Sequence, residues 1–319
     1  MVAASVVVIG AGVSGLTTAV CLAEAGLDVR VDTERLPGAT TSAAAGAMWD
    51  PYLVEPRDRV DVWSRRTLAE LTALSTDPDT GIRLMEGTHE SRIPCEMPSW
   101  GSVVGALPCL PEDLRDGYVT GWRHRAPLVD MPRYLDHLVR RLERAGGSLR
   151  RRRYDTLGEA LREAPVVVNC AGAEARFLAD DPAVDAVRGQ LVVVENPGIG
   201  AFFCDDTPGA DDLTYIYPHA DAVVLGGTAE RGRWELRPDE AATREIVRRC
   251  TAVEPSLADA RVIGQRVGLR PVRTGVRLAE EWRGDRLLVH NYGHGGAGLT
   301  LSWGCAREVV DRVRATPTP

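Results

Sequence analysis

Two glycine-rich segments, one near each end of the chain, hold the residues whose spacing points most directly to chemistry. Gly10, Gly12 and Gly15 have the GxGxxG spacing and follow an apolar run. In such a turn the backbone can approach a pyrophosphate, and the N–H groups that begin the next helix face the anion. The second segment, residues 290–300, reads HNYGHGGAGLT. We therefore expect one nucleotide cofactor that is held from both ends of the chain.

The residues around the first turn predict the elements that such a turn needs. The hydrophobic pattern indicates a strand that ends at Ile9, a helix over 14–25 and a second strand over 27–32. Two carboxylates, Asp32 and Glu34, lie near the end of that second strand, roughly 20 residues after the turn, where a ribose hydroxyl needs an acceptor. The turn alone does not separate NAD from FAD.

The chain has no lysine, so all 38 of its Lys or Arg residues are arginines. This excludes Schiff-base chemistry, a P-loop lysine and a lysine that activates oxygen beside a flavin. Arginine can instead hold a carboxylate with its planar group.

The composition of the chain bears on whether it binds nucleic acid or a membrane and on its cellular location. The net charge of −7 and the pI near 5.5 argue against nucleic acid, and we expect the arginine run 150–153 at a solvated strand edge. No stretch of 18 apolar residues predicts a membrane span. The seven cysteines are scattered without metal-binding spacing, which favours buried thiols and a cytoplasmic location.

The rest of the chain predicts an interleaved organisation without internal repeats. Helices are expected over 60–74, 131–145, 241–252 and 299–313. Strands are expected over 165–173, 191–195, 213–217, 222–226 and 287–290, with irregular strands and loops over 80–110. The strand over 165–173 is apolar throughout, so it belongs in a parallel sheet with the first strands.

Ordered sequence blocks at compatible spacing resemble the D-amino acid oxidase family of FAD-dependent enzymes over nearly the whole chain. These blocks cover residues 7–16, 45–52, 168–172, 188–190, 215–218, 225–228, 268–273 and 290–296. The resemblance implies an α/β fold in which a Rossmann-like FAD-binding domain is interleaved with an α+β substrate domain on a mostly antiparallel sheet. The expected FAD-binding domain comprises 1–48, 140–190 and 270–319, and the substrate domain 49–139 and 191–269.

The same resemblance implies noncovalent FAD and the residues that bind it. The expected contacts are Gly10, Gly12, Val13, Ser14, Gly15, Glu34, Arg35, Thr40, Thr41, Gly46, Trp49, Tyr154, Gly172, Gly295, Gly296, Gly298, Leu299 and Thr300. Glu34 is favoured at the ribose because Glu34-Arg35 matches an Asp-Arg pair of the family, and Asp32 is the alternative. Since lysine is absent, the N–H groups of Leu299 and Thr300 are expected to stabilise the negative charge of reduced flavin.

The resemblance also implies a substrate site and a reaction. Arg270 and the Tyr215 hydroxyl are expected to clamp the substrate carboxylate, and a backbone carbonyl at Gly296 to accept the amine. Transfer of the α-hydrogen as hydride to flavin N5 would yield an imino acid, and then a 2-oxo acid and ammonia, while O2 becomes hydrogen peroxide. We expect Arg273 and Arg277 to be structural, and His290 and His294 to be packing residues or indirect donors.

Departures from the family pattern bear on the substrate. Related D-aspartate oxidases carry extra arginines at positions that here hold Pro208 and Ala229, so neutral D-amino acids, and after them basic ones, are the expected substrates. Asp211 replaces an aromatic residue that often closes the pocket, which predicts a more open site. Met48 and Asp50 are expected in the pocket wall, and Asp205 and Asp206 at its border.

Other functions remain open at this point. One is a flavoprotein amine or D-amino acid dehydrogenase that uses an acceptor other than oxygen, and another is a D-aspartate oxidase. A glycine or sarcosine oxidase would share the fold but needs the missing lysine. The expected partners are a small D-amino acid and O2, with neither nucleic acid nor a membrane, and a homodimer is left open.

Overall fold

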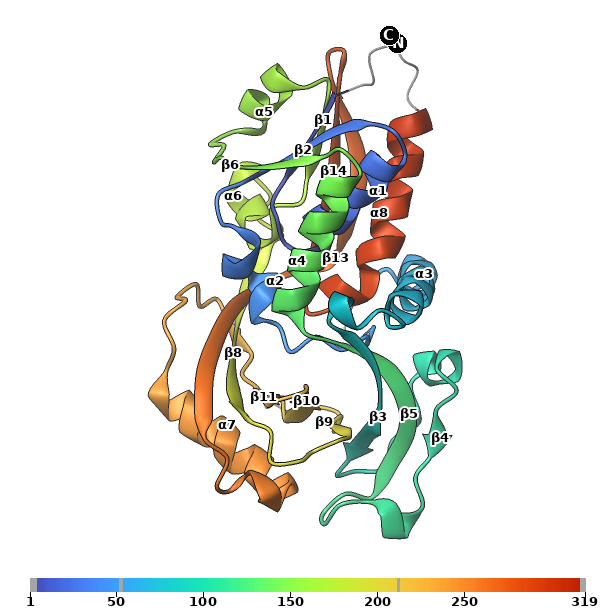
Figure 1. Cartoon of the computed structure of the whole chain (residues 1–319), viewed down its shortest axis with the longest axis vertical. Helices are drawn as coiled ribbons and strands as arrows, with labels where there is room; N and C mark the ends of the chain where they lie inside the picture. Colours follow the sequence, from blue (N-terminus) through green and yellow to red (C-terminus); the bar gives the residue numbers. More distant parts are fainter. Residues whose placement is uncertain (1–4, 52–53, 211–212, 316–319) are drawn as a thin grey trace.

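The computed structural model describes residues 5–51, 54–210 and 213–315, and its two halves share one mixed sheet (Figure 1). The strands are β1 (Ser5–Ile9), β2 (Asp28–Thr33), β3 (Ile82–Ser91), β4 (Leu107–Pro108), β5 (Thr120–Val129), β6 (Ser148–Arg151), β7 (Val166–Asn169), β8 (Asp185–Glu195), β9 (Phe202–Asp205), β10 (Tyr215–Pro218), β11 (Ala222–Gly226), β12 (Glu230–Arg231), β13 (Val262–Arg283) and β14 (Arg286–His294). The α-helices are α1 (Val13–Glu24), α2 (Thr41–Ala44), α3 (Arg57–Leu74), α4 (Met131–Arg144), α5 (Leu157–Glu163), α6 (Ala175–Leu178), α7 (Glu240–Val253) and α8 (Gly298–Ala315). The strand order is β4-β5-β3-β9-β10-β11-β8-β13-β14-β7-β1-β2-β6, with β12 beside β8.

The upper half in Figure 1 is a mainly parallel sheet with helices on both faces, to which the end of β13 adds one antiparallel strand beside β14. β1 pairs in parallel with β2 and β7, and β6 and β14 extend this sheet. Val6 and Val8 of β1 lie in the core that includes α1, α4 and α8, whereas Val7 and Ile9 lie in the core that includes α5. Both faces of β1 are therefore buried, which explains its unbroken apolar run.

The lower half is built on mostly antiparallel strands. β8 to β11 pair antiparallel with their neighbours, as do β3 and β5, while β3 joins β9 in parallel. Ile246 and Cys250 of α7 pack in one core with Val192 and Ile216 of the sheet. The predicted fold class is therefore confirmed, with a Rossmann-like parallel region and a mostly antiparallel second region.

The longest strand, β13, joins the two halves. Residues 262–272 of β13 pair with β8, and residues 277–283 pair with β14 after an irregular register. The sequence pattern did not predict this strand, because Gly264, Gly268 and Pro271 interrupt the hydrophobic alternation. The expected domain boundary at 269/270 falls inside it.

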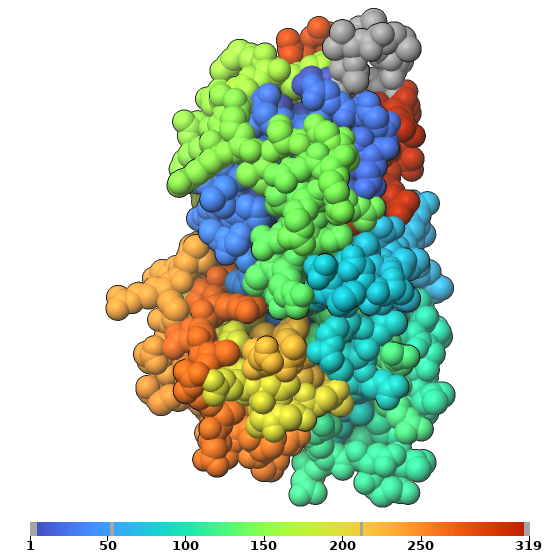
Figure 2. Space-filling model, viewed as in Figure 1, coloured from blue at the N-terminus to red at the C-terminus, as the bar shows by residue number. Residues whose placement is uncertain are grey.

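Segments from distant parts of the sequence lie side by side in both halves. In Figure 2 blue, green and red segments together form the upper half, and cyan, yellow and orange segments form the lower half. The five predicted helices correspond to α1, α3, α4, α7 and α8, with ends that differ by no more than three residues.

The arginine run and the cysteines can now be placed. β6 is the edge strand of the sheet, as predicted. Arg150, however, is not merely solvated, because its guanidinium contacts Asp32 at 2.9 Å and Glu163 at 3.0 Å. All seven cysteines are free thiols, and four of them are buried. In the described part of the chain, no helix is both long enough and apolar enough to cross a membrane.

Candidate active site

A cavity of about 690 Å³ lies where the two halves of the molecule meet. Both glycine-rich segments line it, together with side chains from β8, β9, β10 and β13. The expected cofactor contacts that reach this cavity are Gly10, Gly12, Val13, Ser14, Glu34, Arg35, Thr40, Thr41, Gly46, Tyr154, Gly172, Gly295, Gly296, Gly298 and Leu299. The structure thus brings both ends of the chain together at one elongated site, and the cofactor roles of these residues remain predictions.

The first glycine turn has the geometry of a phosphate cradle. Gly10 has a φ of +102°, and a Cβ there would lie 2.6 Å from the carbonyl oxygen of Cys170. A Cβ on Gly15 would lie 1.9 Å from the carbonyl oxygen of Gly10, so only glycine allows α1 to approach β1 this closely. Gly12 is the N-cap of α1, has no side chain to cap the helix, and lines the cavity. The helix N-terminus can therefore receive a pyrophosphate, as FAD requires.

The two acids at the end of β2 have different surroundings. Asp32 is fully buried and accepts hydrogen bonds from Tyr154 at 2.5 Å, Arg150 at 2.9 Å and Arg30 at 3.0 Å. Burial raises the pKa of Asp32, but these hydrogen bonds outweigh it and leave the pKa below its usual value. Glu34 instead lines the cavity. The Asp32 oxygens are already used within the protein, whereas Glu34, whose Oε1 accepts from Arg153 at 3.3 Å, reaches the cavity, so the ribose prediction stays with Glu34.

Three expected contacts, Gly15, Trp49 and Thr300, do not line the cavity. Gly15 lies instead against the carbonyl oxygen of Gly10, where α1 approaches β1. The Trp49 ring is fully buried, and its Nε1 donates to the carbonyl oxygen of Ser64 at 2.9 Å. The Thr300 hydroxyl donates to the carbonyl oxygen of Asp50 at 2.9 Å and accepts from the Asp50 N–H at 3.0 Å. Both side chains therefore hold the loop around residue 49 in place from the side that faces away from the cavity. The resemblance to the family did not predict this supporting role.

Glycines shape the wall that holds Tyr215 and Arg270, which both line the cavity. A Cβ on Gly226 would lie 1.9 Å from Cζ of Tyr215, and a Cβ on Gly189 would lie 2.4 Å from Nη1 of Arg270. The Arg270 Nη1 donates to the carbonyl oxygen of Thr228 at 2.9 Å, which leaves other N–H groups of the guanidinium for a ligand. Burial raises the pKa of Tyr215 to about 12, so its hydroxyl keeps its proton and can donate.

The C-terminal segment contributes backbone groups to the same wall. Gly296 lines the cavity close to the Arg270 side chain, because a Cβ on it would lie 3.8 Å from Cδ of Arg270. The N–H of Gly295 donates to the carbonyl oxygen of Pro271 at 2.8 Å. Gly293 and Gly295 have positive φ values of +85° and +55°, which this tight turn requires.

The histidines and arginines of this region have structural partners. Burial lowers the pKa of both His290 and His294 to about 4, so both are neutral at pH 7. Nε2 of His294 lies 3.1 Å from Oδ1 of Asn291. Arg273 and Arg277 both contact Asp181, at 3.1 Å and 3.3 Å. These contacts agree with the structural roles expected for them.

Several side chains of the cavity wall were not anticipated in the sequence. Examples are Ser42, His89, Cys204 and Arg231. Ser42 accepts a hydrogen bond from the N–H of Val13 at 2.9 Å, and its place in a run of small residues was the only signal for it. Asp50, Asp205, Asp206 and Ala229 line the cavity as expected, whereas Pro208 is not among its lining residues and Asp211 lies outside the described residues.

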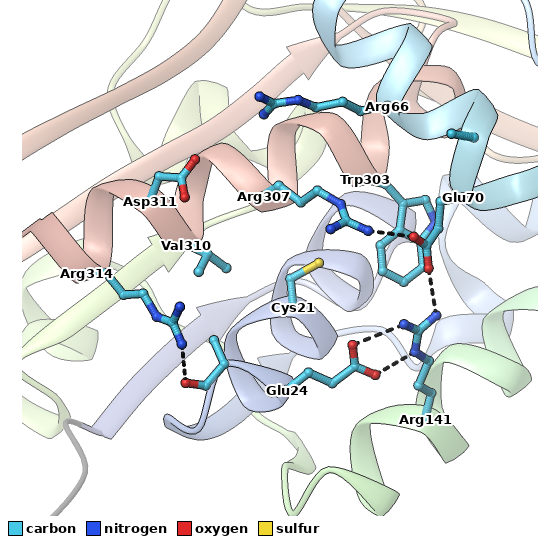
Figure 3. Close-up of a pocket in the computed structure, with 12 residues that line it drawn as sticks. Cys21, Glu24, Arg66, Glu70, Arg141, Trp303, Arg307, Val310, Asp311 and Arg314 are labelled. Atoms are coloured by element: carbon cyan, nitrogen blue, oxygen red, sulfur yellow. Dashed lines mark hydrogen bonds and ion pairs between the residues drawn. The ribbon is translucent and has the colours of Figure 1, made fainter. Parts of the chain in front are cut away.

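A second depression of about 770 Å³ lies apart from this cavity, among α1, α3, α4 and α8 (Figure 3). Arg141 contacts Glu24 at 2.6 Å and Glu70 at 3.2 Å, and Arg307 contacts Glu70 at 2.6 Å. Burial raises the pKa of the Cys21 thiol to about 12. Paired charges and an unreactive thiol make this depression a poor reaction centre. Among the described residues, no cluster of His, Cys, Asp and Glu is arranged to hold a metal ion.

Comparisons with known proteins agree with this geometry. The family described as FAD dependent oxidoreductase matches residues 5–312. The chain is 48% identical to a D-amino-acid oxidase of Rubrobacter xylanophilus, over 97% of this chain and 95% of that protein. It is 38% identical to a D-aspartate oxidase of Homo sapiens, over 99% and 97%. The solved structure of a glycine oxidase from Geobacillus kaustophilus has a TM-score of 0.81 at 19% identity, covering 99% of this chain and 96% of that one, which shows a shared fold.

Proposed function

Because this chain belongs to the FAD dependent oxidoreductase family and uses FAD, we propose that it is an oxidase of neutral and basic D-amino acids. One observation carries the proposal. Arg270 and Tyr215, the groups suited to bind a carboxylate, line the same cavity as the glycine turn that would hold the pyrophosphate. A carboxylate-bearing substrate and the cofactor would therefore meet in one cavity.

The residues of the chain bind and orient, and they supply no acid or base. Arg270 would hold the substrate carboxylate with its fork, Tyr215 would donate to the same carboxylate, and the carbonyl of Gly296 would accept from the amine. FAD, held by the glycine turn at Gly10 and Gly12, would supply the two-electron oxidation of the amino acid to an imino acid, which water would hydrolyse to a 2-oxo acid and ammonia, while O2 would be reduced to hydrogen peroxide. With carboxylate and amine both fixed, only one enantiomer directs its α-hydrogen at the flavin.

Around the flavin, the fold offers a helix N-terminus in place of a lysine. Gly298 begins α8, and Gly298 and Leu299 line the cavity. The N–H groups at this end carry the positive pole of the helix dipole, and they would stabilise negative charge on the reduced cofactor.

A second candidate is a D-aspartate oxidase, which the similarity to the human enzyme of that name favours. This reading needs a cation for the second carboxylate. Ala229 provides none, and Arg231 lies at an exposed position of the cavity wall. A third candidate is a D-amino acid dehydrogenase that uses an electron acceptor other than O2. Only the oxidase would release hydrogen peroxide when the reduced flavin is reoxidised by air.

The test is an anaerobic spectrum of the FAD-loaded protein with matched D- and L-amino acids. We expect D-alanine and D-methionine to bleach the flavin and their L-enantiomers to leave it oxidised. Admission of air should restore the colour and release one hydrogen peroxide per substrate. Bleaching by L-amino acids alone, or faster bleaching by D-aspartate than by D-alanine, would overturn the proposal, and reoxidation without peroxide would favour the dehydrogenase.

We also propose a cellular location, a division into two domains and an oligomeric state to be tested. Free buried thiols support a cytoplasmic location, and we keep 1–48, 140–190 and 270–319 as the FAD-binding domain and 49–139 with 191–269 as the substrate domain. A homodimer is the assembly to test by light scattering of the purified protein.

A further inference from the structure

We propose that Asp50 and Asp206 form a subsite for a cationic group on the substrate side chain, such as the ammonium of a D-lysine, with His89 beside Asp206. This inference rests on the proposed function and names the substrate class that the same site recognises. All three residues line the cavity that holds Tyr215 and Arg270.

The sheet registry places this subsite at a defined separation from the carboxylate clamp. Tyr215 of β10 is the register partner of Cys204 of β9, which is the register partner of His89 of β3. Partners in neighbouring strands point to the same face, and two strand spacings amount to roughly 10 Å. A short substrate such as D-alanine cannot span this separation, whereas a long side chain can approach the far end.

The contacts along this row are continuous. The rings of Tyr215 and Tyr217 stack with centroids 4.4 Å apart, and the Tyr217 hydroxyl lies 3.3 Å from Sγ of Cys204. Met48 packs in the same core cluster as Tyr217 and Cys204. The wall between the clamp and the acids is therefore formed by aromatic, sulfur-bearing and apolar groups, which suit the methylene chain of a long substrate.

The polar groups at the far end lack partners of their own. Asp50 Oδ1 and both ring nitrogens of His89 are buried without a hydrogen bond among the described residues, and His89 is only 1% exposed. The nearest charged contact is from Nδ1 of His89 to Oδ2 of Asp206, at 3.5 Å. A buried acceptor without a donor is costly, so the free oxygen of Asp50 favours a ligand that donates hydrogen bonds, as an ammonium does. The His89 ring, itself a donor when protonated, faces Asp206 rather than this ligand.

Asp205, the neighbouring acid, does not belong to this subsite. Its carboxylate is held by Arg92 at 3.0 Å, by the Tyr118 hydroxyl at 2.9 Å and by the Thr207 hydroxyl at 2.6 Å. The Asp50 backbone is fixed by Thr300, as described above, while its carboxylate has no arginine partner in the described part of the chain. Asp50 and Asp206 are thus the two acids left for a ligand.

The charge balance fits a single cation. Burial lowers the pKa of His89, but the nearby Cys204, Asp206 and Asp50 outweigh it and raise the pKa well above 6.5. Two carboxylates and one imidazolium leave one negative charge, which one ammonium or guanidinium neutralises. A second carboxylate on the substrate would instead meet repulsion.

The subsite can be tested without measuring catalysis, by comparing the affinities of two matched ligands that are not substrates. The compound 6-aminohexanoate is lysine without its α-amine, and hexanoate is the same chain without the ammonium. Isothermal titration of the FAD-loaded protein should show 6-aminohexanoate bound about tenfold to a hundredfold more tightly than hexanoate, as a hydrogen bond to a charged group predicts. Asp50→Asn and Asp206→Asn should each reduce this preference to about threefold or less.

Asp285→Asn is the matched control, because the Asp285 side chain is 90% exposed and is not among the residues of the cavity. It should keep the full preference. Equal binding of the two ligands by the unmodified protein, or a preference that survives in both Asp50→Asn and Asp206→Asn, would overturn the subsite. Flavin bleaching by D-alanine reports the proposed function separately, so its loss and the loss of the ligand preference are distinguishable.

Discussion

Replacement of Gly189 by alanine should displace Arg270 without removing its charge. Gly189 lies on β8 beside β13, and a Cβ there would stand 2.4 Å from Nη1, 2.6 Å from Cζ and 2.7 Å from Nη2 of Arg270. Gly189 does not have a positive φ, so alanine fits the backbone. The overlap is therefore with one flexible side chain, and that side chain must move.

The geometry sets the size of the effect. Nonbonded carbon contacts are favourable at about 3.5–4.0 Å, so the guanidinium must shift by roughly 1 Å. That shift strains the 2.9 Å hydrogen bond to the carbonyl oxygen of Thr228. A misplacement of about 1 Å can cost on the order of a hundredfold in rate, and loss of a charged hydrogen bond costs about 1.5–3 kcal/mol. We expect kcat/KM for D-alanine to fall about tenfold to a hundredfold.

The assay compares kcat/KM, from peroxide release, with the melting temperature of the same preparation. Gly264→Ala on β13 is the control, because a Cβ there meets only Cβ of Val193 at 3.8 Å. Both variants should melt within a few degrees of the parent, and only Gly189→Ala should lose activity. Full activity of Gly189→Ala would refute the role of Arg270, and an equal loss in Gly264→Ala would assign the effect to the strands instead.

Four further outcomes are expected. Arg270→Ala should raise KM and lower kcat/KM by about tenfold to a hundredfold or more. Tyr215→Phe should lower kcat/KM by a factor about ten times smaller. Kinetics of Arg270→Ala close to those of the parent would contradict this. Acid precipitation should release FAD into the supernatant, and a yellow pellet would argue for covalent attachment. D-Aspartate should have a kcat/KM roughly a hundredfold below that of D-alanine, because an unpaired buried carboxylate costs several kcal/mol, and a preference for D-aspartate would exclude the assignment. Burial lowers the pKa of His290 and His294 to about 4, whereas the same side chains in the unfolded chain take up protons near pH 6.5. Protons therefore stabilise the unfolded chain as the pH falls, and the melting temperature should drop between about pH 6.5 and 4. A constant melting temperature over that range would count against their burial as neutral rings.

Local patterns predicted the parts of the fold that depend on neighbours in sequence. The strand before Gly10, the helix after it and the amphipathic helix α4 follow from apolar periodicity and from glycine spacing. β13 follows instead from pairing with β8 and β14, and its glycines and proline conceal it in the sequence. Propensity is a weak guide where tertiary pairing decides the conformation.

The residues of the candidate site also fall into those that the sequence located correctly and those that only the tertiary structure reveals. Arg270, Tyr215 and Gly296 line the cavity where ordered sequence blocks placed them. The orientation of a side chain was beyond that reasoning, so Trp49 and Thr300 were assigned to a cavity that they support from behind. His89 was missed because its place in the cavity depends on the parallel pairing of β3 with β9, a long-range contact without a local signal.

The long strand β13 also explains how the proposed carboxylate clamp, Arg270, and the proposed amine acceptor, Gly296, are placed next to each other. Arg270 lies in the segment of β13 that pairs with β8, and the carbonyl of the next residue, Pro271, accepts from the N–H of Gly295 at 2.8 Å. Gly296 follows directly, so the two groups proposed to bind the substrate stand on backbone segments joined by a hydrogen bond. The backbone therefore fixes the Cα of Arg270 relative to Gly296, while Gly189 and the carbonyl oxygen of Thr228 hold the guanidinium, which together would give the pre-organisation that hydride transfer from one α-carbon requires.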